Sequence, residues 1–544
     1  MKNHTLINII VLAVFLFFPS GAFSQEWVRT FSISNKSALT RQIFESYDHG
    51  FVLGGDLTIG YGGLLKIGWI IKMDVNGNVL WERKLGNGVR MWELQGIEGI
   101  PDGGMILTGG TDTLDNTWYD PWVTKLNACG EIEWCRVFHS NYDLNYGVKI
   151  ISLNDNSYIF LLNNWGGTFP ESSVWLMHLD QTGAIIWEQE YFANDTLARG
   201  EEPQFLTIAP NGNYLVSGTC YYPDSASVSP WWPQPMLVMA DSSGQAVWEL
   251  PWGYARNFCG EGFQSIITGA SGKTVTSISN YLRTPAGGYR PSLIWTSSNG
   301  IPIIYKDLKD STEYGKASTI TSKSDSVFFV GTSYRLNGVD FLSVFKTDSS
   351  GNVISEKLLQ HSEYIPRDAE LTHDNKYLIT ANDVLPNGQS TIKLWKLNSN
   401  LDYDSIYTRP FTYDSLCPHA IVSDTLFPQC DVITGMQEPA KNTEKVKMKV
   451  YPNPAHGTVH VQMPQCIQRE TSTAHLTITT VFHQWNKDLQ FAVYDNFGRL
   501  VMQRSVKPDE KEVVLNVSSW AHGIYLLRLV YLDTVVGREK LVVE

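Results

Sequence analysis

Several tryptophan and tyrosine residues lie in loop-like segments of the sequence, outside the alternation expected of strands. Flat aromatic rings stack on the faces of sugars, so these residues could form a glycan-binding surface. The plainer interpretation is that they cover the ends of sheets. The candidates for ligand contact are Trp118, Trp122, Trp165, Tyr221, Trp231 and Trp232.

Short catalytic motifs give no support for a familiar class of enzyme. The patterns His-Glu-x-x-His, Cys-x-x-Cys and Gly-x-Ser-x-Gly are absent, as is the glycine fingerprint of dinucleotide-binding folds. We therefore expect no cofactor and no metal. Carboxylates from separate parts of the chain could still meet at a glycan-cleaving site, which spacing along the chain cannot show. The nearest adjacent pair, Glu201-Glu202, is interpreted as a solvated turn, because neighbours on a strand face opposite sides.

One segment begins like a calcium-binding loop. Residues 74–78 read Asp-Val-Asn-Gly-Asn, with oxygen-bearing side chains at alternate positions. Such a loop then requires a glycine and a glutamate where the chain has Val79 and Leu85. The segment therefore predicts a hairpin turn.

These residues must be positioned by a segment that repeats along most of the chain. Its first copy, residues 69–81, reads as two strands around a tight turn and ends in a tryptophan. The turn recurs at intervals of 51–61 residues, which is the length of one four-stranded unit. Its glycines are Gly77, Gly130, Gly183, Gly244, Gly300 and Gly351, and a last copy at 392–406 turns at Ser399-Asn400.

A second landmark, a polar turn followed by an apolar strand, shares this period and occurs seven times, beginning with residues 48–53. A four-stranded sheet cannot bury both faces alone, and radial stacking of such sheets solves this. We therefore predict an all-β protein with a seven-bladed β-propeller over residues 25–431. Residues 26–31 resemble the outer strands of later repeats and would complete the last blade. Residues 402–411 offer that blade a second outer strand, so an eighth, degenerate blade over 412–430 stays open.

The composition argues against two classes of partner. The formal charge is −13, from 42 Lys plus Arg and 55 Asp plus Glu, and no dense basic run is present. Nucleic acid and anionic membranes are therefore unsuitable partners. The first 24 residues have one lysine, an apolar run and small residues before Gln25, which predicts a cleaved secretory signal peptide. No later segment is apolar enough to span a bilayer, so the mature chain should have no transmembrane segment.

Seven cysteines in an exported chain predict disulfides with one thiol left over. The candidate pairs are Cys417 with Cys430, which bracket a short segment at the end of the propeller, Cys129 with Cys135, which flank one hairpin, and Cys220 with Cys259; Cys466 is then the odd one.

Beyond a polar linker at 432–447 the period breaks, and residues 448–544 alternate as in a small immunoglobulin-like β-sandwich. This tail resembles the C-terminal (type A, Por-type) sorting domain of type IX secretion cargo. An insertion at 464–487 departs from the family's pattern. The matching segments are 450–454, 493–501, 515–528 and 537–543, and their key residues are Tyr451, Pro452, Asn453, Pro454, Gly498, Gly523, Tyr525 and Lys540.

The resemblance implies passage across the outer membrane of a Gram-negative cell by the type IX machinery, often with attachment to the cell surface. The repeats are similar to those of secreted propellers that carry such tails, a group without a shared chemistry. We therefore predict an exported surface or extracellular protein that binds a glycan or protein without catalysis. The alternatives are a glycan hydrolase or lyase with carboxylates from several blades, and a structural adhesion protein.

Overall fold

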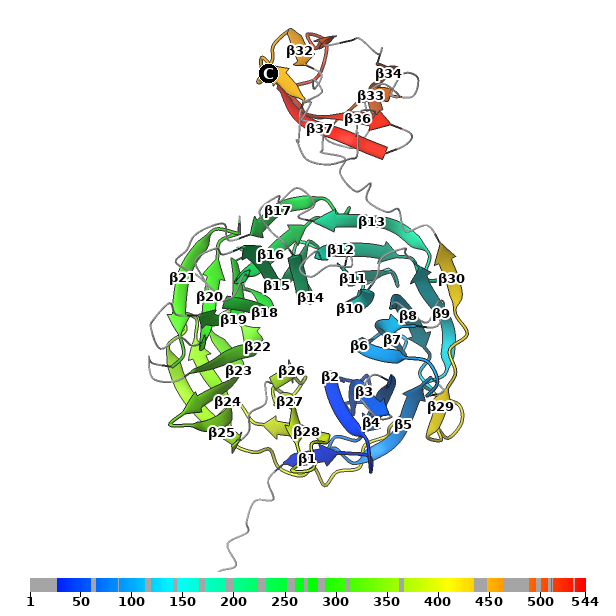
Figure 1. Cartoon of the computed structure of the whole chain (residues 1–544), viewed down its shortest axis with the longest axis vertical. Coiled ribbons are helices and arrows are strands. Elements are labelled where there is room, and N and C mark those ends of the chain that lie inside the picture. Colours follow the sequence, from blue (N-terminus) through cyan, green and yellow to red (C-terminus); the bar gives the residue numbers. More distant parts are fainter. Residues whose placement is uncertain are drawn as a thin grey trace, which may run out of the picture. The chain divides into compact units, whose positions relative to one another are not determined.

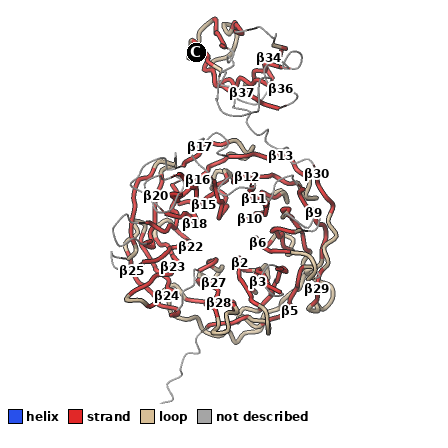
Figure 2. Tube along the Cα trace, in the orientation of Figure 1, coloured by secondary structure: helices blue, strands red, loops and turns tan. Residues whose placement is uncertain are grey.

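The chain contains strands, turns and loops, and no helix among the residues that the computed structural model describes (Figure 2). Two compact units, residues 1–436 and 437–544, divide it. The described residues are 27–59, 65–86, 88–112, 119–139, 144–165, 172–191, 200–223, 231–251, 260–268, 273–281, 289–298, 300–309, 314–361, 366–434, 448–462, 489–495, 500–506, 510, 512–531 and 534–544.

The first unit is a ring of antiparallel four-stranded runs around a common centre (Figure 1). The innermost strands are β2 (Ser37–Glu45), β6 (Trp92–Gly99), β10 (Leu144–Ser152), β14 (Gly200–Ile208), β18 (Gly260–Thr268), β22 (Tyr314–Ser324) and β26 (Pro366–Leu371). The second strands are β3 (Phe51–Ile59), β7 (Met105–Thr111), β11 (Tyr158–Trp165), β15 (Tyr214–Pro223), β19 (Lys273–Tyr281), β23 (Val327–Leu336) and β27 (Tyr377–Val384).

The outer half of each run continues the same order. The third strands are β4 (Leu65–Met73), β8 (Asp120–Leu126), β12 (Ser172–Leu179), β16 (Trp231–Ala240), β20 (Tyr289–Thr296), β24 (Val339–Asp348) and β28 (Ser390–Leu397). The outermost strands are β5 (Val79–Leu85), β9 (Ile132–His139), β13 (Ile185–Tyr191), β17 (Ala246–Pro251), β21 (Pro302–Asp307), β25 (Val353–His361) and β1 (Val28–Phe31).

Stacking of the runs on their neighbours explains where the sequence is apolar. The second strand β7 is buried at every position, whereas the outermost strand β5 begins with two exposed residues and then alternates between buried and partly buried ones. Middle strands are covered on both faces and therefore need continuous apolar sequence, while the rim faces water on one side. The core is accordingly a series of apolar clusters, each shared between neighbouring runs.

The ring closes as the sequence predicts, because the N-terminal strand β1 pairs with β28, with Val28 opposite Trp395. The junction between this last run and the run that begins with β2 is called the seam. Residues 412–430, which an eighth blade would use, contain one described strand, β29 (Asp424–Leu426), and it pairs with β5 instead.

Residues 402–434, called the strap, cross the seam along the outside of the ring (Figure 1). The strap begins beside the last run, where Asp404 Oδ1 forms an ion pair with Lys376 Nζ at 2.7 Å. It then pairs in parallel with the outer strands β5 and β9, through β29 and β30 (Asp431–Thr434). Strand β30 covers the first residues of the predicted linker, so the first unit extends past residue 431.

Two disulfides fix the strap, and they correct the pairing predicted from sequence. Cys129 bonds Cys417, and Cys135 bonds Cys430. The local pair of Cys129 with Cys135 fails because Cys135 lies four residues along β9 from the turn, roughly 13 Å at 3.3 Å per residue, beyond disulfide reach. Cys220 is buried in β15. Its predicted partner Cys259, like Cys466, lies outside the described residues, so that pairing stays a prediction.

Where a repeat ends in a tryptophan, that residue packs on the turn of the next run. A Cβ on Gly183 would lie 2.7 Å from the Trp134 ring, and one on Gly130 would lie 3.1 Å from Trp81. The Trp134 indole N–H also donates to the Gln181 carbonyl at 3.1 Å. A tryptophan four residues after its own turn glycine is therefore in position to pack against the turn of the next run.

The second unit packs two sheets on one apolar core that contains residues of both. One sheet has the order β31-β32-β35 and the other β34-β33-β36-β37. Their bounds are β31 (Lys449–Tyr451), β32 (Thr458–Gln462), β33 (Leu489–Tyr494), β34 (Leu500–Ser505), β35 (Glu512–Asn516), β36 (Gly523–Tyr531) and β37 (Thr534–Val543).

The tail motif has a clear structural use within this unit. The Asn453 side chain donates to the Lys540 carbonyl at 2.7 Å and accepts from the Val542 N–H at 2.8 Å. The Tyr525 hydroxyl donates to the Ala521 carbonyl at 2.8 Å. The motif thus ties the start of the tail to its last strand. Gly498 lies outside the described residues.

Replacing Gly183 by alanine should destabilise the protein more than replacing Gly212 by alanine. Both glycines have a positive φ, of 80° and 82°, so both variants lose about 1–2 kcal/mol to left-handed backbone. Only the Cβ at 183 would meet a tryptophan, and overpacking adds about 1–3 kcal/mol. Urea unfolding of the full chain, followed by tryptophan fluorescence, measures the difference. Equal midpoints would contradict a rigid contact between tryptophan and turn.

Candidate functional site

The structure moves one predicted ligand contact into the core. Trp122 is fully buried in β8 and its ring lies 5.5 Å from that of Trp92. The sequence analysis placed it in a loop-like segment before a hairpin, but it belongs to the strand that begins at Asp120. Tyr221 is half-buried, and its hydroxyl donates to Glu202 at 3.0 Å. Trp118 and the side chains of Trp165, Trp231 and Trp232 lie outside the described residues.

The adjacent carboxylates Glu201 and Glu202 are also placed differently from the prediction. They lie in the innermost strand β14 and not in a turn, and Glu201 is buried. The sequence did not indicate a strand here because the innermost strands contain few apolar residues, so the alternation typical of a strand is missing. By contrast, the calcium-like segment is confirmed as a hairpin turn, since Asp74 accepts the backbone N–H groups of Asn76 and Asn78, each at 2.8 Å.

Every innermost strand carries a β-bulge at the same place, which the sequence analysis missed. A bulge re-aims side chains and is common beside functional sites. The bulged residues are mostly polar. They are Arg41, Gln95, Val148, Gln204, Gln264 with its neighbour Phe263, Ser318 and Arg367.

Polar side chains next to the bulges join neighbouring runs. Gln42 accepts the Ile97 N–H at 2.9 Å, and Gln264 accepts the Ile320 N–H at 3.2 Å. At the seam, Asp368 accepts the Ile43 N–H at 2.9 Å. These bonds satisfy backbone groups that have no strand beside them. They are one reason why the centre of the ring is polar.

A charged network lies near the beginning of the innermost strands. Arg41 contacts Asp56 at 3.0 Å and Glu93 at 2.6 Å, and Lys66 also contacts Glu93 at 2.6 Å. Burial would lower the pKa of Arg41, but these two carboxylates more than offset it, so the pKa is raised. Burial raises the pKa of Asp56 to about 6 despite Arg41. The network is charged and largely self-satisfied.

Three carboxyl groups gather toward the end of the innermost strands, and we call Glu98, Asp368 and Glu370 the carboxyl cluster. Burial raises the pKa of each, to about 8 for Glu370. The charge of Asp368 also raises the pKa of Glu98 and of Glu370, and that of Glu98 raises the pKa of Glu370, while the ammonium of Lys149 lowers the pKa of Glu98 and Asp368. Perturbed carboxyl groups contributed by different strands are a common feature of acid–base sites.

Arg367 stands apart from the other charged residues of the centre. It is the bulged residue of β26, and it is exposed. Although its side chain reaches solvent, desolvation by the protein around it and then the charge of Arg41 lower its pKa to about 10. Among the described residues no carboxylate pairs with it. A guanidinium in this position is available to an anionic group that enters the ring.

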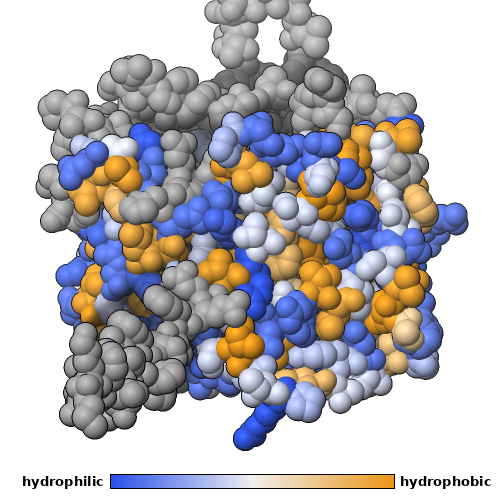
Figure 3. Space-filling model, turned by 90° about the horizontal axis from the view of Figure 1, so that it is seen from below, coloured by the Kyte–Doolittle hydropathy of each residue, from blue (hydrophilic) through white to orange (hydrophobic). Residues whose placement is uncertain are grey.

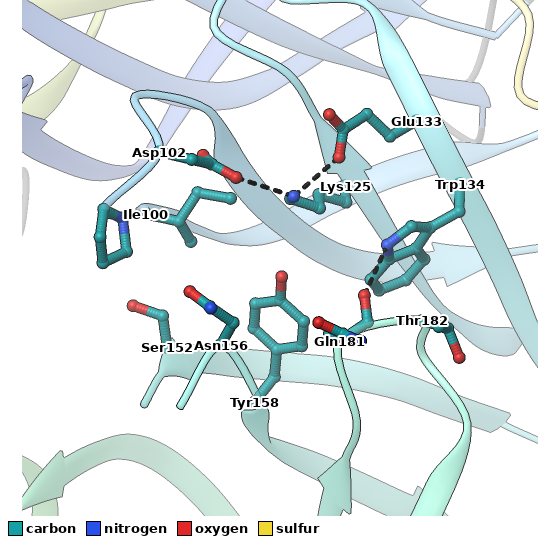
Figure 4. Close-up of a pocket in the computed structure, with 11 residues that line it drawn as sticks. Ile100, Asp102, Lys125, Glu133, Trp134, Ser152, Asn156, Tyr158, Gln181 and Thr182 are labelled. Carbon is teal, nitrogen blue, oxygen red and sulfur yellow. Dashed lines mark hydrogen bonds and ion pairs between the residues drawn. The ribbon is translucent and has the colours of Figure 1, made fainter. Parts of the chain in front are cut away.

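The cavity in Figure 4 lies away from this centre, between two neighbouring runs, with a volume of about 340 Å³. Lys125 points between Asp102 and Glu133, at 2.8 and 2.7 Å. These hydrogen bonds raise the pKa of Lys125 above its usual value, against the effect of burial. Tyr158 and Trp134 form the opposite wall (Figure 4). The ammonium is thus already neutralised.

The strap fills the corresponding position one run earlier. There the Trp81 indole N–H donates to Asp414 at 3.1 Å, and the Lys72–Asp48 ion pair is almost fully buried. The cavity is therefore the place that the strap leaves open, and we do not take it as the main site. On the side of the molecule in Figure 3, hydrophobic residues lie in small groups between hydrophilic ones. No helix among the described residues is long and apolar enough to cross a membrane.

Comparison with known proteins identifies the tail. Residues 449–544 match the secretion system C-terminal sorting domain. The protein is therefore secreted, by the type IX machinery, and proteins with this domain are often attached to the cell surface. No curated protein matches the chain.

Solved structures similar to the chain have low identity. A polysaccharide lyase, an ulvan lyase, is 9% identical over 69% of this chain and 96% of its own, with a TM-score of 0.46. An α-L-arabinofuranosidase from Fusarium graminearum is 9% identical over 68% and 96%, with a TM-score of 0.38. A protein of unknown function from Bacteroides caccae is 13% identical over 50% and 82%, with a TM-score of 0.30. No chemistry carries over at these values.

The raised pKa of Glu370 predicts a pH dependence of stability. Its value is about 8 in the folded chain and ordinarily 4.5, so the folded state holds the proton more tightly. This contribution to stability is fully present below about pH 4.5 and is lost as the pH rises through about 8. The apparent melting temperature should therefore fall over this range, and Glu370→Gln should reduce the slope. Thermal unfolding at a series of pH values tests this, with the surface variant Glu131→Gln as control. An unchanged slope in Glu370→Gln would contradict the assignment.

Proposed function

We propose that this exported protein is a seven-bladed β-propeller that binds an acidic extracellular glycan at the centre of its ring, without cleaving it. In this proposal a signal peptide ends at residue 24. The propeller runs from residue 25 through β30, and the tail is an immunoglobulin-like sandwich that brings the chain to the outer-membrane surface.

The observation that carries the proposal is Arg367. It lies at a bulge of an innermost strand, is exposed, and has no carboxylate partner among the described residues. Arg41 is near enough to lower its pKa, but the Arg41 guanidinium is already paired with Asp56 and Glu93, so Arg367 is the guanidinium left for a ligand. Guanidinium binds carboxylate and sulfate groups in a planar, bidentate manner. Acidic polysaccharides carry such groups, whereas neutral ones do not.

A second candidate function is cleavage of the same kind of glycan, and the carboxyl cluster favours it. A carboxylic acid whose pKa is about 8 keeps its proton at neutral pH and can protonate a leaving oxygen. Glu370 would be that proton donor. Against this role, one oxygen of Glu370 already accepts the Glu45 N–H at 3.3 Å, and Asp368 is occupied by two hydrogen bonds.

Binding should depend on the charge of the polysaccharide and on Arg367. We expect the full mature chain to retain polygalacturonate, alginate or heparin and not dextran, and Arg367→Gln to weaken retention about 10- to 100-fold, the effect of losing a charge-assisted contact. Arg335→Gln is the matched control, because Arg335 is an exposed arginine paired with Asp340.

Product formation is read in the same samples. New reducing ends or unsaturated sugars, abolished in Glu370→Gln, would establish the second candidate instead. Equal retention of dextran, or an Arg367→Gln variant that binds as well as the wild type, would reject the central arginine site.

Export should depend on the tail alone. A chain that lacks residues 448–544 should accumulate in the periplasm, because it has lost the sorting domain, while a reporter fused to residues 437–544 should reach the surface. Fractionation and surface proteolysis of a host with type IX secretion measure both. Normal display of the truncated chain would contradict the role of the tail.

A further inference from the structure

Three metal-binding side chains meet at the seam, at the ends of two innermost strands. Glu45 ends β2, and His49 lies in the turn that follows it. His373 lies in the equivalent turn after β26, 328 residues from Glu45. The cluster therefore joins the first and last runs of the ring. Local motif searches miss it because its ligands come from opposite ends of the repeat array.

The three donor atoms converge on one point. His49 Nδ1 lies 3.1 Å from Glu45 Oε1, and His373 Nδ1 contacts the same oxygen. The two imidazole rings are stacked, with centroids 3.8 Å apart and planes at 29°. One ligand atom of each residue lies within 4.8 Å of the others. Ligands of a tetrahedral zinc ion with bonds of about 2.0–2.2 Å are about 3.3–3.6 Å apart, so small movements of these side chains would complete the site.

The backbone holds these side chains in place before any ion arrives. Glu45 Oε2 accepts the backbone N–H of His373 at 2.6 Å, which fixes the carboxylate across the seam. The His49 N–H donates to the Ser46 carbonyl at 2.9 Å, and the residue has a φ of 64°. Side-chain exposure is 11% for Glu45, 45% for His49 and 53% for His373, so an ion can enter from solvent.

We propose that Glu45, His49 and His373 bind one divalent transition-metal ion of the zinc class, with a water molecule in the fourth position. Two imidazoles and a carboxylate suit Zn²⁺ and its neighbours, whereas Ca²⁺ and Mg²⁺ prefer sites made of oxygen ligands. The ion clips the last run to the first and stabilises the closed ring, because it binds the folded chain and not the separated turns. This role does not depend on the proposed glycan site.

Two alternatives are weaker. In the first alternative there is no ion, and both imidazoles donate hydrogen bonds to Glu45 Oε1 while their rings stack. A metal ion bound by all three residues explains directly why these atoms lie together. A second group of possible ligands, Cys129, Cys417 and His419, cannot serve, because its two sulfur atoms form a disulfide and a metal requires thiolates.

The test uses the untagged mature chain after treatment with EDTA. Calorimetric titration with Zn²⁺ should show one site, and Co²⁺ should give the visible absorption of a tetrahedral ion. His49→Asn, in which asparagine tolerates the positive φ, and His373→Ala should each weaken binding at least about a hundredfold. His419→Asn is the matched control, an exposed histidine beside Glu131, and should bind Zn²⁺ as the wild type does.

Zn²⁺ should also raise the melting temperature of the wild type and of His419→Asn, but not that of the two ligand variants. Circular dichroism and melting of the metal-free variants establish that they fold. The proposal is overturned if the wild type binds no stoichiometric ion, or if folded His49→Asn and His373→Ala bind Zn²⁺ as tightly as the wild type.

Discussion

Backbone N–H groups of the innermost strands face a neighbouring sheet and not another strand, and this constraint shapes the centre of the ring. A buried N–H without an acceptor is costly. The β-bulges turn polar side chains toward the next run, where Gln42, Gln264 and Asp368 accept such groups. The centre is therefore polar for structural reasons before any function is considered. This explains why the innermost strands lack the apolar runs that mark the second and third strands.

The same constraint is most demanding at the seam, where two runs distant in sequence must fit. Strand β1 pairs with β28 there, Asn382 accepts the Thr40 N–H at 2.8 Å, and Asp368 accepts that of Ile43. The strap then crosses the outside, and its disulfides close loops of 288 and 295 residues. Loops of this length restrict the unfolded chain strongly in the entropic model of disulfide stabilisation. The cluster of Glu45, His49 and His373 lies at the same junction.

The sequence was informative wherever structure is local. Repeat period, hairpin turns and the closing strand follow from glycine spacing and from the likeness of residues 26–31 to later outer strands, and all were predicted. The bulges were not predicted, because the innermost strands have too few apolar residues to show an alternation that one extra residue would interrupt. Disulfide pairing and the carboxyl cluster were missed since their members meet only when the ring closes. Trp122 was assigned to a loop-like segment, whereas the strand already begins at Asp120 and tolerates Pro121 near its start.

The carboxyl cluster has a structural role in the fold, and Arg367 has none among the described residues. Asp368 and Glu370 accept backbone groups of the first run, so their burial, and hence their raised pKa, follows from holding the seam together. A perturbed pKa at this position is therefore weaker evidence for catalysis than it would be in a cleft with no structural duty. Arg367 performs no such duty among the described residues. A guanidinium kept at the centre without a carboxylate partner has no evident structural reason, and a ligand supplies one. For this reason the charge of Arg367, more than the acidity of Glu370, directs the functional interpretation toward binding.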